Sequence, residues 1–311
     1  MTRAMRFGVI TSGEPDGRAW RRLAQRAEEL GYSTLFMPDH FQDQWSPTVG
    51  LTVAAEATTR LRVGTLVYDN DYRHPVVLAK EMATLDVVCE GRVEFGLGAG
   101  WKRDDYDHSG LSFDGAGTRI SRMIESLAVM RGLWASADPV TFSGQHYRIA
   151  GAVGTPRPHR PNGPLVCIGG GGRRILSFAA READIVAVNA TLRTGTLSAE
   201  VAATATPDAF DEKLGWVRDA AGARLEDIEL QCHCAFTKVT SDGPQTLESM
   251  AGAFGVSPRE APDVPLLLVG TIDELCDAIL SRRERWGFTY WVIPDTAVES
   301  FAPVVDRLAG R

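Results

Sequence analysis

The sequence predicts an α/β fold of the (β/α)8 barrel class, and three observations lead to this prediction. Eight short apolar runs in the 311 residues have the length of buried strands. Each run is almost continuously apolar, as expected where helices cover both faces of a parallel sheet. The first four runs recur at intervals of about 30 residues, the size of one strand–helix–strand unit. An open, doubly wound sheet is the alternative topology.

The first half of the chain alternates strands and helices in a regular order. Strands are expected at 6–11, 33–38, 61–67 and 92–98. Helices are expected at 20–30, 48–59, 75–89 and 120–134. Trp20, Ala24 and Ala27 lie on one apolar stripe of the first helix, which Gly31 ends. Pro75 suits the first turn of the third helix.

The second half continues the pattern, with interruptions. Four more strands are expected at 164–169, 184–189, 227–239 and 289–294. A hairpin insertion near 138–150 is expected to turn at Ser143–Gly144. Two stretches, near 190–206 and 252–265, are rich in small and turn-forming residues and are predicted to be mobile insertions. Residues 1–311 are therefore expected to form a single TIM barrel domain with insertion loops.

The bulk composition excludes several classes of protein. A net charge of −7 argues against a nucleic-acid-binding protein, which usually presents a basic face. No apolar run reaches the roughly 18 residues that predict a membrane span, and the N-terminus lacks the pattern of a signal peptide. The five cysteines have no regular spacing, which is typical of a reducing compartment. A cytoplasmic protein is therefore expected.

Polar and glycine-rich residues follow several of the predicted strands. In a parallel barrel the carboxyl ends of all strands meet at one face, where active sites lie. Thr11 follows the first strand, Asp39 and His40 follow the second, and Asp69 follows the third. A glycine-rich loop follows the fifth. Their convergence on one face, more than any one residue, indicates a functional site.

The stretch IGGGGRR (168–174) joins the fifth strand to a helix. Glycines let backbone N–H groups approach a ligand closely, and a helix N-terminus favours negative charge. Arg173 and Arg174 add cationic groups. The pattern predicts a phosphate site, although it is neither a P-loop nor a strict GxGxxG. A tight turn that binds nothing is the alternative.

Two further histidine-containing stretches have contrasting interpretations. Asp39 could simply bond nearby backbone N–H groups and His40 could pack beneath Trp45, but their place at a strand end favours function. The run Cys232-His233-Cys234 suggests a metal site. Within a strand, however, the two cysteines point to one side and the histidine to the other, so no metal is expected there.

Longer motifs resemble a known family along essentially the whole chain. They are RFGVIT, ELGYSTLFMPDHF, TTRLRVGTLV, RHPVVLAKEMATLDVVCEGRVEFGLGAGW, VTFSGQHYRI, PLVCIGGGGRR and the closing GFTYWVIP. Together they resemble the luciferase-like monooxygenase superfamily and, within it, the F420-dependent oxidoreductases. This resemblance implies a TIM barrel, a homodimer, and F420 or FMN bound at the carboxyl ends of the strands.

The resemblance assigns roles to residues around the cofactor ring. Asp39 and His40 are expected beside the ring, with Trp45 on the substrate side; these three are the expected catalytic residues. His40 would donate or accept a proton, and Asp39 would orient His40 or bond the ring. Trp45, Tyr68 and Trp101 would line an apolar substrate pocket.

The resemblance also implies how the cofactor is held. A non-prolyl cis peptide between Leu66 and Val67 would form a bulge under the ring. Asp104, in the loop after the fourth strand, would contact the cofactor. The phosphate would bind at the glycine loop, through Gly169, Gly170, Gly171 and Arg173.

The implied function is that of an F420-dependent oxidoreductase, which transfers a hydride between F420 and a small organic substrate. Use of the reduced cofactor F420H2 to reduce that substrate is the expected direction. Sugar-phosphate dehydrogenases of this branch carry a catalytic Glu where Trp101 stands here, so sugar-phosphate oxidation is not expected. An FMN-dependent monooxygenase and a non-catalytic protein that binds flavin or deazaflavin are the alternatives.

Overall fold

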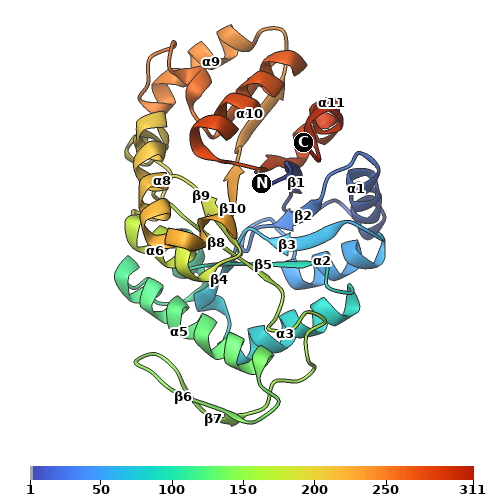
Figure 1. Cartoon of the computed structure of the whole chain (residues 1–311), viewed down its shortest axis with the longest axis vertical. Helices are drawn as coiled ribbons and strands as arrows, with labels where there is room; N and C mark the ends of the chain where they lie inside the picture. Colours follow the sequence, from blue (N-terminus) through green and yellow to red (C-terminus); the bar gives the residue numbers. More distant parts are fainter. Residues whose placement is uncertain (1–2) are drawn as a thin grey trace.

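The protein is a closed barrel of eight parallel strands surrounded by helices (Figure 1). The computed structural model describes residues 3–311. Strands pair in the order β3-β2-β1-β13-β10-β9-β8-β5, and β3 also pairs with β5 to close the ring. The strands are β1 (Arg6–Ile10), β2 (Thr34–Met37), β3 (Arg62–Thr65), β5 (Val93–Gly98), β8 (Leu165–Gly170), β9 (Ile185–Val188), β10 (Glu229–His233) and β13 (Tyr290–Pro294).

This topology confirms the predicted barrel, and each predicted strand overlaps one barrel strand. The open sheet is wrong, because Val63 and Gly64 of β3 pair with Val93 and Glu94 of β5. The two ends of the described chain also meet, since the backbone N–H of Met5 donates to the carbonyl oxygen of Arg311 at 2.9 Å.

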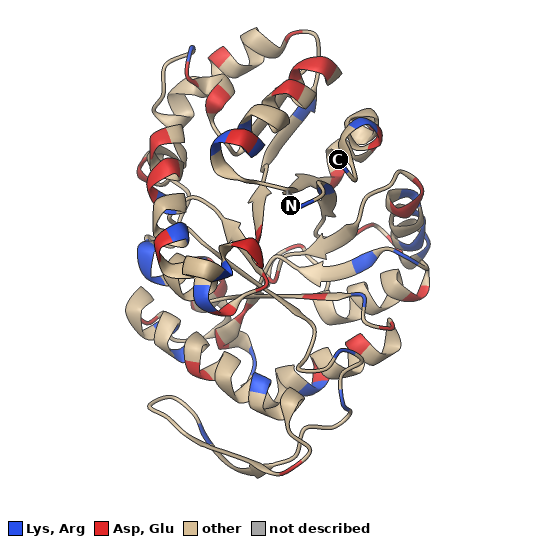
Figure 2. Ribbon diagram, in the orientation of Figure 1, with Lys and Arg blue, Asp and Glu red and all other residues tan. Residues whose placement is uncertain are grey.

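The main helices pack outside the barrel. They are α1 (Gly17–Glu29), α2 (Pro47–Glu56), α3 (Pro75–Val88), α5 (Ala116–Ala135), α6 (Arg173–Glu182), α8 (Pro207–Ala221), α10 (Ile272–Trp286) and α11 (Val298–Leu308). Charged residues occur mainly on these outer helices, and the strands carry few of them (Figure 2). Asp16 begins α1 by accepting hydrogen bonds from two N–H groups of its first turn, and Gly31 follows its end at φ 83°. No helix within residues 3–311 is both long and apolar enough to cross a membrane.

A buried ion network crosses the barrel interior near the amino ends of the strands. Glu94 of β5 accepts hydrogen bonds from Arg6 (2.5 Å), Arg62 (2.7 Å) and Tyr290 (2.9 Å). Arg6 also pairs with Glu229 of β10. Burial alone would raise the pKa of Glu94, but the two guanidinium groups outweigh it and hold that pKa below its ordinary value. The network ties five of the strands together on the side away from the polar strand ends.

The insertions follow the predicted pattern with one correction. The hairpin is formed by β6 (Val140–Ser143) and β7 (Arg148–Ala152), and it projects from one end of the molecule (Figure 1). The strand predicted at 227–239 is wrong as a single strand, because β10 ends at His233 and β11 (Phe236–Val239) leaves the barrel. β11 pairs instead with β12 (Leu267–Gly270), whose short apolar run was not predicted as a strand.

The two predicted mobile insertions contain short helical turns. The first includes α7 (Ala199–Ala202) and η2 (Ala203–Ala205), and the second includes η4 (Gly252–Phe254) and η5 (Ala261–Asp263). Their mobility and the single-domain organisation of the whole chain stay predictions.

The peptide bond between Leu66 and Val67 is cis, which confirms the bulge expected after β3. The chain then continues as the short strand β4 (Tyr68–Asp69), which pairs with the end of β5. The bulge fits because β5 carries glycines opposite it. A Cβ atom on Gly96 would lie 1.9 Å from the carbonyl oxygen of Thr65, and one on Gly98 would lie 2.5 Å from a methyl of Val67.

The substitution Gly96→Ala is therefore expected to destabilise the protein. Its methyl group would collide with backbone and not with a flexible side chain, so we expect a loss of about 3 kcal/mol in the free energy of unfolding, measured by urea denaturation. Gly215→Ala in α8 is the matched control, since nothing lies within 4 Å of a Cβ there. Alanine should leave that helix unchanged or more stable by up to about 1 kcal/mol. Equal stability of the two variants would contradict the proposed role of Gly96.

Candidate functional site

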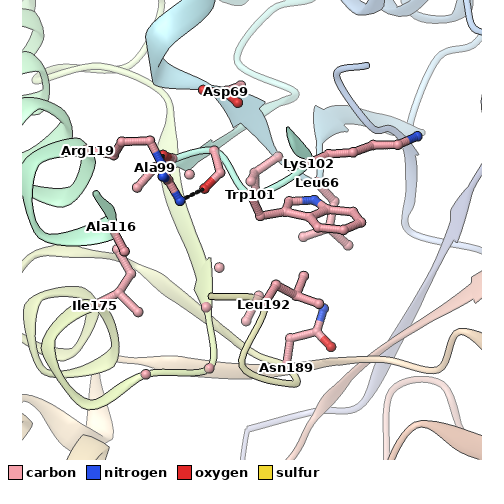
Figure 3. A pocket seen from close by; sticks show the side chains of 18 of the residues that line it. Leu66, Asp69, Ala99, Trp101, Lys102, Ala116, Arg119, Ile175, Asn189 and Leu192 are labelled. Atoms are coloured by element: carbon pink, nitrogen blue, oxygen red, sulfur yellow. Dashed lines mark hydrogen bonds between the residues drawn. The ribbon is translucent and has the colours of Figure 1, made fainter. Parts of the chain in front are cut away.

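A cavity of about 260 Å³ opens at the carboxyl ends of the barrel strands (Figure 3). The indole of Trp101 and the side chains of Leu192 and Asn189 lie on one side of it, and Arg119 and Ile175 lie on the other. The sequence-predicted site residues that line the cavity are Asp39, His40, Leu66, Val67, Tyr68, Trp101, Gly169, Gly170 and Gly171. The structure thus brings together residues from four different strand ends.

Three sequence-predicted site residues lie elsewhere. Trp45 is partly buried against Trp20, with ring centroids 5.5 Å apart, and does not line the cavity. Arg173 is exposed at the first position of α6. Asp104 is exposed because the predicted loop after β5 contains the helix α4 (Arg103–Ser109), which turns this side chain outward.

His40 is held by the neighbour of Asp104. Asp105 is fully buried, and its Oδ2 lies 2.6 Å from Nδ1 of His40. Oδ1 of Asp105 accepts from the backbone N–H of Phe41 at 3.3 Å, and the hydroxyl of Tyr72 donates to Oδ2 at 3.2 Å. A carboxylate only accepts hydrogen bonds, so Nδ1 of His40 carries the hydrogen and Nε2 is left for a ligand. Asp105 therefore orients His40, a role that was predicted for Asp39.

Asp39 is occupied by other partners. Its carboxylate accepts two hydrogen bonds from Arg73, at 2.5 and 3.2 Å, and one from the backbone N–H of Asp69 at 3.1 Å. Such a two-point pairing with a guanidinium fixes the orientation of a carboxylate. Arg73 also lies over the ring of Tyr68, 4.8 Å from its centroid. Asp39 thereby fastens the end of β2 to the segment that follows the bulge.

Asp69 is a buried carboxyl group on the cavity wall, and no role was predicted for it. The hydroxyl of Tyr106 lies 3.0 and 3.1 Å from its two oxygens, and the backbone N–H of Asp71 donates to it at 2.9 Å. Burial raises the pKa of Asp69 to about 7, and the charges of Asp71 and Asp39 act in the same direction. Gly100 (φ 74°) passes so close that a Cβ would lie 2.4 Å from an Asp69 oxygen.

The glycine loop joins β8 to α6 and packs closely against neighbouring residues. A Cβ on Gly171 would lie 2.3 Å from the carbonyl oxygen of Ala190, and one on Gly170 would lie 2.5 Å from Ile175. Gly172 is the residue before the first turn of α6 and has no side-chain cap. The N–H groups of that first turn are therefore available to an anion, as predicted for a phosphate site.

Arg119 and Asn189 also line the cavity and were missed. Arg119 of α5 is buried, and it donates to the carbonyl oxygens of Ala99 (3.1 Å) and Gly100 (3.3 Å) (Figure 3). It thus holds the chain after β5 in place and is not a free cation. Asn189 follows β9, and its Oδ1 accepts from the N–H of Ala190 at 2.7 Å. Neither residue stands in a motif that marks a site, so nothing in the pattern singled them out.

The run Cys232-His233-Cys234 has the predicted geometry. The Sγ atoms of Cys232 and Cys234 lie 3.4 and 3.6 Å from the carbonyl oxygen of Pro265, whereas His233 lines the cavity. Within residues 3–311, no group of three or more His, Cys, Asp and Glu side chains is arranged to hold a metal ion.

Comparisons with known proteins identify relatives of this barrel. A sequence profile described as luciferase-like monooxygenase matches residues 5–209, more than half of the chain. The F420-dependent glucose-6-phosphate dehydrogenase of Amycolatopsis mediterranei (strain U-32) is 32% identical over 194 residues, which cover 58% of this chain and 56% of that protein. The chain thus spans about half the length of this relative.

Two solved structures share the fold over nearly the full length. An F420-dependent secondary alcohol dehydrogenase in complex with an F420-acetone adduct aligns with a TM-score of 0.78 at 19% identity, covering 98% of both chains. The oxygenating component of 3,6-diketocamphane monooxygenase from Pseudomonas putida, in complex with FMN, aligns with a TM-score of 0.73 at 16% identity and covers 99% and 98% of the two chains. At these identities the similarity establishes the fold alone.

The raised pKa of Asp69 predicts a pH dependence of stability. Between about pH 4 and 7 the unfolded chain has lost the Asp69 proton while the folded protein retains it, so stability falls as the pH rises. Asp69→Asn removes this decline. From pH 5 to pH 8 we expect the variant to gain on the order of 2 kcal/mol relative to the parent protein in urea denaturation. The exposed Asp219→Asn is the control, and parallel pH profiles for Asp69→Asn and the parent would contradict this assignment.

Proposed function

The chain belongs to the luciferase-like monooxygenase family, and from this premise we propose that it is an F420-dependent oxidoreductase. In this proposal it transfers a hydride between coenzyme F420 and a small organic substrate, acting as an F420H2-dependent reductase. The observation that carries the proposal is the placement of Leu66, Val67 and the Gly169–Gly171 loop on the walls of one cavity. That pairing suits a cofactor with a flat ring and a phosphate.

The residues present fit such a cofactor. The loop at Gly170 and Gly171 has no room for side chains, so its backbone can approach a ligand closely, and it leads to the uncapped first turn of α6. Leu66 and Val67 offer an apolar surface for one face of a ring. Arg173, exposed at the start of α6, is proposed to approach the phosphate from outside the cavity.

F420, a deazaflavin, supplies hydride transfer when it is bound, and the protein supplies orientation and proton transfer. We propose that Nε2 of His40 exchanges a proton with the substrate, while Asp105 holds the ring through Nδ1. Trp101 stands edge-on to His40, with ring centroids 5.8 Å apart, and both residues line the cavity together with Tyr68. Asp39, paired with Arg73, keeps the end of β2 in position.

The roles predicted for Trp45 and Asp104 stay proposals with less support. Trp45 would act on the substrate side only through the loop that carries His40, because its ring packs on Trp20. Asp104 faces solvent, and a contact with the cofactor would require α4 to turn.

An FMN-dependent monooxygenase is the second candidate, since a protein with bound FMN shares the fold. Sugar-phosphate oxidation has less support, because an indole at Trp101 cannot serve as a general acid or base. A protein that binds a deazaflavin without catalysis would have no use for the His40–Asp105 pair.

We also propose that the chain acts as a homodimer in the cytoplasm. Val49 of α2 and Val77, Val87 and Val88 of α3 are exposed apolar side chains on neighbouring helices (Figure 1). All five cysteines are free and buried, as suits a reducing compartment.

Sedimentation velocity tests the dimer, and a monomer at micromolar concentration would contradict it.

The cofactor is tested by titration of the purified protein. F420 is expected to bind with micromolar affinity, observed as quenching of its fluorescence, and FMN is expected to bind at least about tenfold more weakly, a difference of about 1.4 kcal/mol. Tight FMN binding without F420 binding would favour the monooxygenase.

Asp105→Asn tests the orientation of His40. An amide can donate its own hydrogen to Nδ1 and so favour the wrong tautomer, which should lower kcat by roughly 10²-fold. F420 affinity should change little, because Asp105 does not line the cavity. Asp107→Asn on the outer face of α4 is the matched control. Full activity of Asp105→Asn would show that His40 acts without this partner.

A further inference from the structure

The cavity wall carries a second histidine that the roles above do not use. His233 is the last residue of β10, and it lines the same cavity as His40. Strand alternation sends the flanking Cys232 and Cys234 away from the cavity, toward Pro265. The backbone of His233 is held in place by the sheet, because His233 pairs in register with Val292 of β13.

His233 lies across the barrel from the bulge. Around the closed ring, β10 is four strands from β3 in either direction, through β2, β1 and β13 or through β5, β8 and β9. A ring that rests on Leu66 and Val67 therefore turns its free face toward His233. That free face is where a substrate must sit.

The imidazole of His233 has no protein partner. Its pKa is lowered to about 4 by burial alone, with no ion pair or hydrogen bond from the rest of residues 3–311 to offset it. His233 is therefore uncharged at neutral pH. A neutral imidazole offers one N–H donor and one nitrogen acceptor, and here both are free for a ligand.

The charged side chains of the cavity are engaged elsewhere or lie at its rim. Asp39 is paired with Arg73, Asp69 is hydrogen-bonded to the hydroxyl of Tyr106, and Arg119 donates to backbone carbonyls. Lys102 donates to Gln42 at 2.5 Å and extends away from the cavity (Figure 3), and Arg193 is exposed. An ion placed against His233 would lose its hydration without gaining a counter-charge, which is strongly unfavourable.

We propose that His233 is a specificity-determining residue that hydrogen-bonds the hydroxyl or carbonyl oxygen of an uncharged substrate. The substrate class is therefore neutral alcohols and carbonyl compounds, as opposed to carboxylates and amines. This inference rests on the proposed function, because it assumes that a ring occupies the bulge.

The test uses three probes of one shape: cyclohexanol, cyclohexanone and cyclohexanecarboxylate. They are titrated into the full-length, F420-loaded protein with ¹⁵N-labelled histidine, and the imidazole signals are followed by NMR. We expect the two neutral probes to shift the His233 signals and the carboxylate to leave them unchanged. His233→Phe should weaken binding of the neutral probes on the order of 5- to 10-fold and leave F420 affinity unchanged.

Further variants separate hydrogen bonding from shape and folding. His233→Gln keeps a donor and an acceptor and should retain more affinity for the neutral probes than His233→Phe. His108→Gln on the exposed face of α4 is the matched control, and it also assigns one histidine signal. Failure of F420 to bind would overturn the proposed function itself. If F420 binds but the His233 signals ignore the neutral probes, or follow the carboxylate instead, the proposed role of His233 is wrong.

Discussion

The packing of the Leu66–Val67 bulge against the glycines of β5 is the constraint on which the site depends. β3 pairs with β5 to close the barrel, and the bulge at Leu66–Val67 that follows β3 also packs against β5. It fits there because Gly96 and Gly98 have no side chains. Beyond the bulge, β4 carries Tyr68 and Asp69 to the cavity wall. The segment after β4 also places Arg73 beside Asp39. The bulge and the residues that follow it therefore link the ends of β2, β3 and β5.

The polar groups divide into two layers along the barrel axis. The lower layer, around Glu94, has matched charges and no opening to the cavity, so its role is to hold the strands in register. The upper layer joins side chains distant in sequence: Asp39 with Arg73, His40 with Asp105, and Asp69 with Tyr106. Each pair fixes a cavity-wall residue by a partner outside the wall. These side chains are thereby ordered before a ligand binds, which reduces the conformational entropy lost on binding.

Much of the fold was predictable, because eight continuous apolar runs, the first four of them about 30 residues apart, are typical of a parallel barrel in a chain of this length. The resemblance to a family further located the cis bond at Leu66–Val67, which no pattern in the residues would show. The outward direction of the Asp104 side chain could not be predicted. On a helix, adjacent residues point about 100° apart, so the inward side chain at 105 depends on the rotation of α4, which the sequence does not reveal.

Other site residues depend on long-range packing. Asp69 is raised in pKa by burial under Tyr106 and Gly100, residues more than 30 positions away. His233 was considered only as part of a metal site, which strand geometry argued against. The same geometry that sends two cysteines outward sends the histidine into the cavity. The prediction considered only metal binding at this motif, and so it did not place His233 on the cavity wall.

A crystal structure of the protein with bound F420 tests most directly whether one ring cofactor rests on the bulge with its phosphate at the glycine loop. We expect the deazaflavin ring against Leu66 and Val67, with the phosphate within hydrogen-bond distance of the Gly169–Gly171 loop and the first turn of α6. His40 and His233 should lie near the free side of the ring. A ring bound away from the bulge, or a phosphate held by other elements, would contradict this arrangement.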